Sequence, residues 1–93
     1  MFVVDVRNAS ELQSGYIENA LNISLIEICK LAQQNKLSEK IPTDKQIYLH
    51  CKSGLRSLMA WSVLRRNGYV NHVNIERGYD AIKLENHHLR FIE

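Results

Sequence analysis

The sequence is poor in cysteine and has no long apolar run, and each absence excludes a class of protein. Its 93 residues contain two cysteines, Cys29 and Cys51, which are too few for a disulfide framework and form no Cys-x-x-Cys motif. We expect both to be thiols, as in a reducing cytosol. No apolar run approaches the ~18 residues that cross a membrane, and the run at residues 1–6 lacks the basic flank of a signal peptide. These absences predict a cytoplasmic protein without a role for a membrane.

Strong charge of one sign is also missing. The chain has 12 Lys and Arg against 10 Asp and Glu, a formal net charge of +2, and its basic residues are scattered apart from Arg65 and Arg66. Its four histidines, at positions 50, 72, 87 and 88, lack the spacing of metal ligands. We therefore expect no nucleic-acid partner, no metal ion and no cofactor.

The chain has one proline, Pro42, and no linker or low-complexity tract, so we expect a single domain over residues 1–93. Short apolar runs rich in β-branched residues predict strands at 2–6, 20–23, 46–50 and 72–75. Helices are predicted at 8–15, after Ser24, and at 55–67. Strands that alternate with helices predict an α/β fold, a small open and mostly parallel sheet of about four strands flanked by helices.

Two capping patterns mark where the first helices begin. Asn8 followed by Glu11 predicts the short helix, and Ser24 followed by Glu27 has the spacing of a capping box. Cys29 lies on the apolar face of the helix after Ser24, with no cation arranged around it. We therefore expect Cys29 to be an inert packing residue.

Cys51 is a different case, because it ends a predicted strand and begins the segment "CKSGLRS". Gly54 permits a sharp bend there, and the free amides of the following helix add to a ring of N–H donors. Such a ring stabilises a thiolate, and Lys52 and Arg56 add positive charge. Lowering the pKa by about two units takes roughly 2.7 kcal/mol. The alternative is a core cysteine that happens to end a strand. It gives no reason for the glycine and the two cations that follow at the start of a helix. Ligands also bind such sheets at the carboxyl ends of strands.

Four segments of the chain match, in order, the motifs of one family. They are "VVDVRNASEL" (3–12), "GYIENALNI" (15–23), "CKSGLRS" (51–57) and "NGYVNHVNIERGYDAI" (67–82). The matched motifs are a strand with D-V-R and a short helix, G-[HY]-I-x-x-A-x-N-I, an active-site loop, and a G-[FY]-x-x-V stretch with its sequel. On these residues the chain resembles the rhodanese-like domain, and most closely the single-domain bacterial sulfurtransferases.

The resemblance implies a role for each matched residue. Cys51 would be the nucleophile that becomes a persulfide. The amides around its sulfur would come from the active-site loop of Lys52, Ser53, Gly54, Leu55 and Arg56. Asp5 and Arg7 match the D-V-R pair, which we interpret as an ion pair bracing the fold near the site; an exposed pair worth under ~1 kcal/mol is the alternative.

The chain departs from the family pattern in two places. Where the family often has G-G-x-x-A-W, this chain has Arg77 in place of the first glycine and Ile82 in place of the tryptophan. It also begins at the D-V-R strand, without the short strand and helix that usually precede it. We therefore expect four strands rather than five, with one edge of the sheet less covered than usual.

The resemblance implies a sulfurtransferase that moves a sulfane sulfur through Cys51. The donor would be a small anion such as thiosulfate or a partner protein's persulfide, and the acceptor a thiol, or cyanide in an assay. Phosphatases share this fold, but six residues from Cys51 to Arg56 make a ring that is small for phosphate. A non-catalytic interaction module or a sulfur carrier is the alternative from another class. His50 alternates with Cys51 in side-chain direction and is a poor candidate for a general base.

Overall fold

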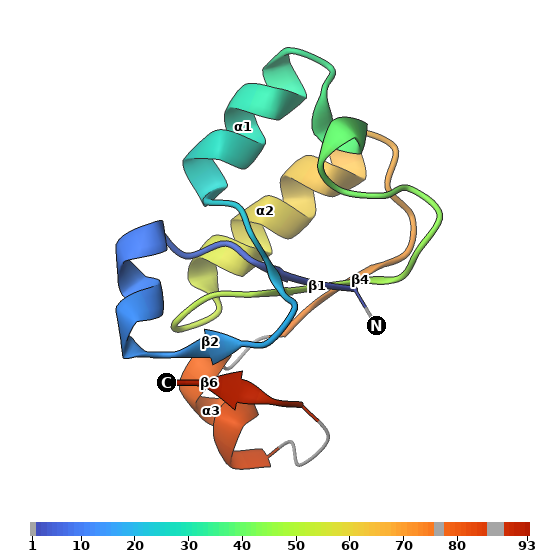
Figure 1. Ribbon diagram of the computed structural model, residues 1–93. Helices are drawn as coiled ribbons and strands as arrows, with labels where there is room; N and C mark the ends of the chain where they lie inside the picture. Colours follow the sequence, from blue (N-terminus) through green and yellow to red (C-terminus); the bar gives the residue numbers. More distant parts are fainter. Residues whose placement is uncertain (1, 76–77, 86–88) are drawn as a thin grey trace.

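A four-stranded parallel sheet forms the centre of the structure (Figure 1), in the strand order β3-β1-β4-β5. The computed structural model describes residues 2–75, 78–85 and 89–93. The strands of this sheet are β3 (Leu21–Asn22), β1 (Phe2–Asp5), β4 (Ile47–His50) and β5 (His72–Asn74). Each is parallel to its neighbour. The predicted α/β architecture is confirmed, and all four strands lie within the ranges expected from the sequence.

The register of β1 against β4 brings their carboxyl ends together. Asp5 lies opposite His50, and the amide of Val6 donates to the carbonyl of His50 at 2.9 Å. Because Cys51 directly follows His50, the turn after β4 begins beside the segment that follows β1. This edge of the sheet is the one where parallel α/β folds bind ligands.

Helices cover the two faces of the sheet unequally (Figure 1). The helices α1 (Leu25–Gln33) and α2 (Leu55–Arg66) lie together on one face, while α3 (Gly78–Glu85) lies on the other, beside a second, two-stranded antiparallel sheet. That small sheet pairs β2 (Tyr16–Ile17) with β6 (Phe91–Ile92). Two short 3-10 helices, η1 (Ala9–Ser14) and η2 (Leu37–Glu39), complete the fold.

Both predicted capping patterns are present. The hydroxyl of Ser24 accepts a hydrogen bond from the amide of Glu27 at 3.3 Å, at the start of α1. The carboxylate of Glu11 accepts one from the amide of Asn8 at 2.8 Å. The short helix that follows Asn8 is η1, a 3-10 helix.

Four short elements, β2, η2, α3 and β6, were not predicted from the sequence. The strands β2 and β6 are only two residues long, so they show no alternation of apolar and polar residues. Ile82, which stands where the family often has tryptophan, is buried with Val3, Ile17 and Tyr79 in an apolar cluster on the α3 face. The other departure, Arg77, lies outside the described residues, as do His87 and His88. No helix in the described part of the chain is long and apolar enough to cross a membrane.

Candidate active site around Cys51

Cys51 lies in the turn between β4 and α2, at the carboxyl edge of the parallel sheet. The turn is closed by Gly54, whose φ of 98° is in the left-handed region that favours glycine. Gly54 is also the N-cap of α2, so the free amides of the first helical turn face back toward the cysteine. Cys51 is fully buried, with 0% of its surface exposed.

The sulfur of Cys51 is surrounded by hydrogen-bonding groups. The amide of Gly54 donates to Sγ at 3.0 Å and the amide of Ser57 at 3.4 Å. The thiol in turn donates to the hydroxyl of Ser57 at 3.5 Å, and that hydroxyl donates to the carbonyl of Gly54 at 3.1 Å. Two amide donors thus converge on the sulfur, and Ser57, one residue beyond the predicted loop, contacts it twice, once as a donor through its amide and once as an acceptor through its hydroxyl.

These groups change the acidity of the thiol in opposite directions. Burial alone raises the pKa of Cys51, because a thiolate is less well solvated in the interior. The hydroxyl and amide of Ser57 lower the pKa, and so do the amides of Gly54 and Ser53. The hydrogen bonds outweigh burial, so the pKa of Cys51 lies below that of an ordinary thiol. The direction agrees with the one expected from the ring of amides, and the contributions that lower the pKa are hydrogen bonds from Ser57, Gly54 and Ser53.

Arg56 is held by a residue that was predicted only as a helix cap. Its guanidinium donates two hydrogen bonds to the carboxylate of Glu11, at 2.6 and 2.8 Å. The hydrogen bond from Arg56 lowers the pKa of Glu11 to about 2, with the amide of Asn8 adding to the effect against the cost of burial. The same hydrogen bond raises the pKa of Arg56. The ion pair fastens the start of α2 to η1, and it leaves Arg56 with less free charge than the sequence suggested.

The remaining residues of the predicted loop face the solvent. Lys52 and Ser53 are exposed, and Leu55 is 65% exposed at the first position of α2. Within the described part of the chain, no ion pair involves Lys52. Lys52 is therefore the loop cation that has no carboxylate partner among the described residues.

Asp5 and Arg7 form a buried ion pair behind the turn. The two side chains meet at 2.7 Å, and the guanidinium of Arg7 also donates to the carbonyl of Gly15 at 2.9 Å. It stacks 4.4 Å from the centre of the Tyr79 ring as well. The predicted ion pair is present, and the alternative of an exposed pair is wrong because both side chains are buried.

His50 is buried between this ion pair and Tyr79. Its Nε2 lies 3.7 Å from a carboxylate oxygen of Asp5, and its ring stacks on that of Tyr79 with centroids 6.1 Å apart. Burial lowers the pKa of His50, and Arg7 adds to the effect while Asp5 opposes it. Neither ring nitrogen has a hydrogen-bond partner among the described residues. Burial thus favours the neutral form of the imidazole, whose ring packs on that of Tyr79.

The turn is also held from the other face of the sheet, by the beginning of α3. The amide of Tyr79 donates to the carbonyl of Cys51 at 2.8 Å. A methyl group added to Gly78 would lie 1.9 Å from the carbonyl oxygen of Lys52, and Gly78 has a φ of +76°. Gly78 thus allows α3 to touch the backbone of the turn, a contact that the sequence gave no reason to expect.

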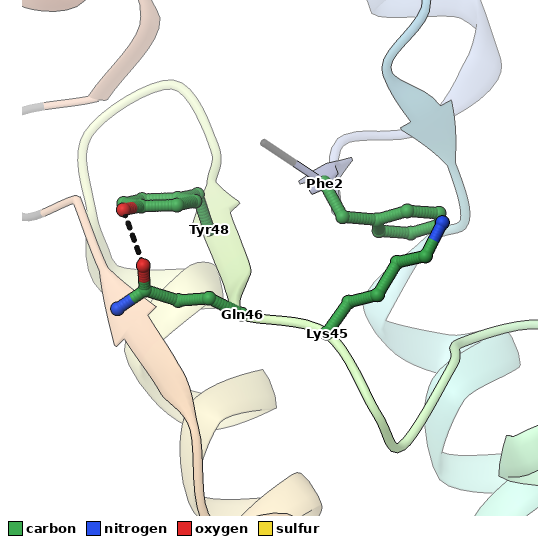
Figure 2. A pocket seen from close by; sticks show the side chains of 4 residues that line it. All are labelled: Phe2, Lys45, Gln46 and Tyr48. Carbon is green, nitrogen blue, oxygen red and sulfur yellow. Dashed lines mark hydrogen bonds between the residues drawn. The ribbon is translucent and has the colours of Figure 1, made fainter.

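A pocket at the opposite edge of the sheet has none of these features. It is lined by Phe2, Lys45, Gln46 and Tyr48, at the amino ends of β1 and β4 (Figure 2). The hydroxyl of Tyr48 donates to the side-chain oxygen of Gln46 at 2.7 Å, and the ammonium of Lys45 lies 5.9 Å from the centre of the Phe2 ring. The four lining residues include no cysteine.

Cys29 lies on α1, half-buried against the apolar core between the sheet and the two helices. It has the packing position expected from the sequence. Among the residues that the structure describes, no group of three or more His, Cys, Asp or Glu side chains is arranged to hold a metal ion.

Comparisons with known proteins point in the same direction as the geometry. The family model described as "Rhodanese-like domain" matches residues 1–85. An uncharacterized protein of Bacillus subtilis, YqhL, is 35% identical over 77 residues, which cover 83% of this chain and 56% of that protein. A protein of Allochromatium vinosum named "Sulfurtransferase" is 34% identical over 83 residues, covering 87% of this chain and 70% of its own.

A solved structure has the same fold. The crystal structure of a rhodanese-related protein from Thermoplasma volcanium superposes with a TM-score of 0.74 at 30% identity, over 96% of this chain and 82% of that one. The chain thus spans most of the length of two of these three proteins and little more than half of YqhL.

Proposed function

The chain belongs to the rhodanese-like domain family, and on that basis we propose that it transfers a sulfane sulfur by way of a persulfide on Cys51. The observation that carries the proposal is the environment of Sγ. Two amides point at a buried sulfur whose pKa is lowered by hydrogen bonds, which is the arrangement a thiolate nucleophile requires. A relative named as a sulfurtransferase supports the reaction class.

The reaction would proceed by two displacements. The Cys51 thiolate attacks the outer sulfur of thiosulfate, the bond between its two sulfurs breaks, and sulfite leaves with the electron pair. Cys51 then carries one additional sulfur. An acceptor attacks that outer sulfur, so that cyanide becomes thiocyanate or a thiol becomes a persulfide, and the Cys51 thiolate is regenerated. The same amides stabilise the anion at the beginning and at the end of the cycle.

Ser57 would adjust to the charge of the sulfur. In the thiol form, its oxygen accepts the proton of Sγ while its own proton is donated to the carbonyl of Gly54. When Sγ is ionised, the Ser57 hydroxyl can rotate and donate to the sulfur instead, since a hydroxyl is both donor and acceptor. Ser57 therefore acts as a positioning residue that supports the thiolate.

The charged residues would have two tasks, attracting the donor and holding the turn in shape. Lys52, exposed beside the turn, attracts an anionic donor. Arg56, paired with Glu11, holds the turn in shape rather than presenting a free charge. The buried pair of Asp5 and Arg7 braces the backbone behind the turn. This assignment uses no metal and no cofactor, and it needs a reducing compartment such as the cytoplasm in which Cys51 stays a thiol.

Size argues against the phosphatase alternative. The turn from Cys51 to Arg56 contains six residues, and the amides of Gly54 and Ser57 converge on Sγ itself rather than on a space beyond it. A transferred sulfur needs room for one atom, whereas phosphate presents several oxygens that each need donors. A sulfur carrier, the other alternative, would form the same persulfide but would not turn over small donors.

The proposal is tested by loading the protein with thiosulfate and measuring its intact mass. We expect a gain of one sulfur atom that is retained in Cys29→Ala and absent in Cys51→Ala, and we expect thiocyanate to form when cyanide is added. A persulfide that releases no more than one thiocyanate per chain, without repeated turnover of thiosulfate, would favour the sulfur carrier. Hydrolysis of an aryl phosphate without any persulfide would overturn the proposal.

A further inference from the structure

The helix that follows the reactive turn exposes apolar side chains next to Cys51. Leu55, Leu58 and Met59 are 65%, 49% and 51% exposed. Their spacing of i, i+3 and i+4 places them on one side of α2, over its first two turns. We call these three residues the apolar face of α2. Because Leu55 directly follows Gly54, this face begins at the rim of the turn that holds the sulfur.

Among the residues that the structure describes, the apolar core does not include this face. The side of α2 that packs against the sheet and α1 is formed by other residues, among them Ala60 and Leu64, both of which are fully buried. A single exposed apolar side chain is ordinary on a protein surface. Three neighbouring ones at the entrance of a candidate active site indicate a contact surface.

The charged residues of the turn and of α2 are all basic. No Asp or Glu occurs from Lys45 to Ile75, a stretch that contains the turn and all of α2. Lys52 is exposed at one end of the face, and Arg65 and Arg66 are exposed at the far end of the helix. The acidic residue that contacts this helix, Glu11, is already paired with Arg56, so the complement of the helix is an acidic surface with apolar side chains.

A small donor does not need such a surface, since thiosulfate requires only a cation and the sulfur itself. We propose that the apolar face of α2 and Lys52 form the docking site for an acidic protein segment that carries a cysteine, and that Cys51 exchanges sulfur with that cysteine. This inference rests on the proposed function and names its substrate class. In the transfer, the partner's thiolate attacks the outer sulfur of the Cys51 persulfide, the bond between the two sulfurs of that persulfide breaks, and the electron pair remains on the Cys51 thiolate.

The expected interface is small and short-lived. Three apolar side chains with surrounding charges suit an interface at the low end of the size range, below ~1,200 Å² in total, as in transient redox encounters. Charge complementarity in such encounters raises the association rate, and added salt screens it within a Debye length of about 10 Å at 0.1 M. The dependence of the transfer rate on salt concentration therefore distinguishes docking of the partner from a direct reaction between the two sulfur groups.

The experiment uses two synthetic peptides as acceptors, each with one cysteine beside two leucines. In one peptide the flanking residues are glutamates, and in the other they are lysines. Cys51 is first loaded with thiosulfate, and transfer to each peptide is followed by mass spectrometry; transfer to cyanide is measured in parallel. We expect kcat/KM for the acidic peptide to exceed that for the basic one by about ten-fold at low salt, with the difference shrinking in high salt. The pKa of the two peptide thiols is measured so that rates are compared per thiolate.

Substitutions on the helix test the surface without touching the turn. Leu58→Glu with Met59→Glu should lower transfer to the acidic peptide roughly ten-fold and leave transfer to cyanide within about two-fold. Leu58→Lys with Met59→Lys removes the apolar contact but keeps the charge, and should lower transfer to the acidic peptide by less. The matched control is Val70→Glu, which replaces a side chain 91% exposed beyond the opposite end of α2 and should change neither reaction.

The outcomes separate the two proposals. Equal transfer to both peptides, with normal transfer to cyanide, would overturn the docking site and leave the sulfurtransferase intact. An equal loss toward cyanide and peptide in the Glu variants would also overturn it, because the substitutions would then act on the turn or the fold. Absence of a Cys51 persulfide in the unmodified protein would overturn the proposed function itself.

Discussion

The two ends of strand β4 offer opposite environments. At the amino end, a pocket is lined by the rings of Phe2 and Tyr48 and by the cation of Lys45 (Figure 2). At the carboxyl end, Cys51 lies in a tight turn, with the amides of Gly54 and Ser57 directed at its sulfur. The two ends therefore differ in what their backbone and side chains present: rings and a cation at one, and a sulfur with amide donors at the other.

The direction of the chain explains the difference. In a parallel sheet every strand leads, at its carboxyl end, into a segment that starts the next helix, so free N–H groups collect there. The start of α2 faces the sulfur of Cys51, and the start of α3 donates to its carbonyl. The amino ends receive helix C-termini instead, where carbonyls dominate and cations such as Arg65 and Arg66 are favoured. A thiolate is stabilised at one end only.

The largest expected effect comes from the charges buried at the carboxyl end. Arg7→Met leaves the carboxylate of Asp5 buried without its partner and should lower the free energy of unfolding by about 3–5 kcal/mol. Lys45→Met removes the cation over the Phe2 ring at the amino end and should cost under about 1 kcal/mol. Urea unfolding measures both.

A double variant separates charge from packing in that test. Asp5→Asn with Arg7→Met removes both charges, and we expect it to be more stable than Arg7→Met alone, because no unpaired carboxylate remains. If Arg7→Met and Lys45→Met lowered the free energy of unfolding equally, the expected difference between the two ends of β4 would be contradicted.

A smaller effect is expected at two glycines: Gly78, which begins α3 against the turn of Cys51, and Gly68, which follows the C-terminal end of α2. Gly78→Ala adds a methyl group that overlaps the carbonyl of Lys52, so the turn must shift, and a displacement of about 1 Å lowers turnover by as much as 10²-fold. Gly68→Ala meets the same backbone constraint, at φ +91°, but nothing lies within 4 Å of the added methyl. Both variants should lose stability, and only Gly78→Ala should lose sulfur transfer beyond the fraction unfolded.

The comparison is made with circular dichroism for stability and with thiocyanate formation for activity, on the same preparations. If the two glycine variants lost activity in proportion to their stability alone, the contact between α3 and the turn would have no special role.

The smallest effect concerns the partly exposed pair of Glu11 and Arg56. Its carboxylate has a pKa of about 2 in the folded chain against about 4.3 for a free glutamate. A depressed pKa stabilises the fold above the unfolded value and loses that contribution as the pH falls from about 4.3 to about 2. Glu11→Gln should therefore cost up to about 1 kcal/mol at pH 6, since partly exposed pairs contribute little, and nothing near pH 2. A difference independent of pH would contradict this account.

The sequence predicted the sheet and the reactive turn because both depend on local signals. Strands such as 46–50 show apolar, β-branched runs, and Gly54 with the following helix indicates a ring of amides around Cys51. The chain's match to the rhodanese-like family then supplied the reaction.

What the sequence did not predict depends on contacts between distant segments. Glu11 shows the pattern of a helix cap, and only folding brings it to Arg56, 45 residues later. Gly78 is required by its approach to Lys52, which no local pattern encodes. Ser57 is the exception: as the third residue of α2 its free amide had to face the turn, and the helix start at Leu55 contained that information.

The central claim is that hydrogen bonds in the turn lower the pKa of the Cys51 thiol, and a titration of that thiol tests it most directly. The ultraviolet absorbance of the thiolate is followed against pH in Cys29→Ala, with Cys29→Ala/Cys51→Ala as the blank. We expect a midpoint below the ~8.5 of a free thiol, and a higher midpoint when Ser57→Ala removes the hydroxyl beside the sulfur. A midpoint at or above ~8.5 in the chain with an intact Ser57 would contradict the account.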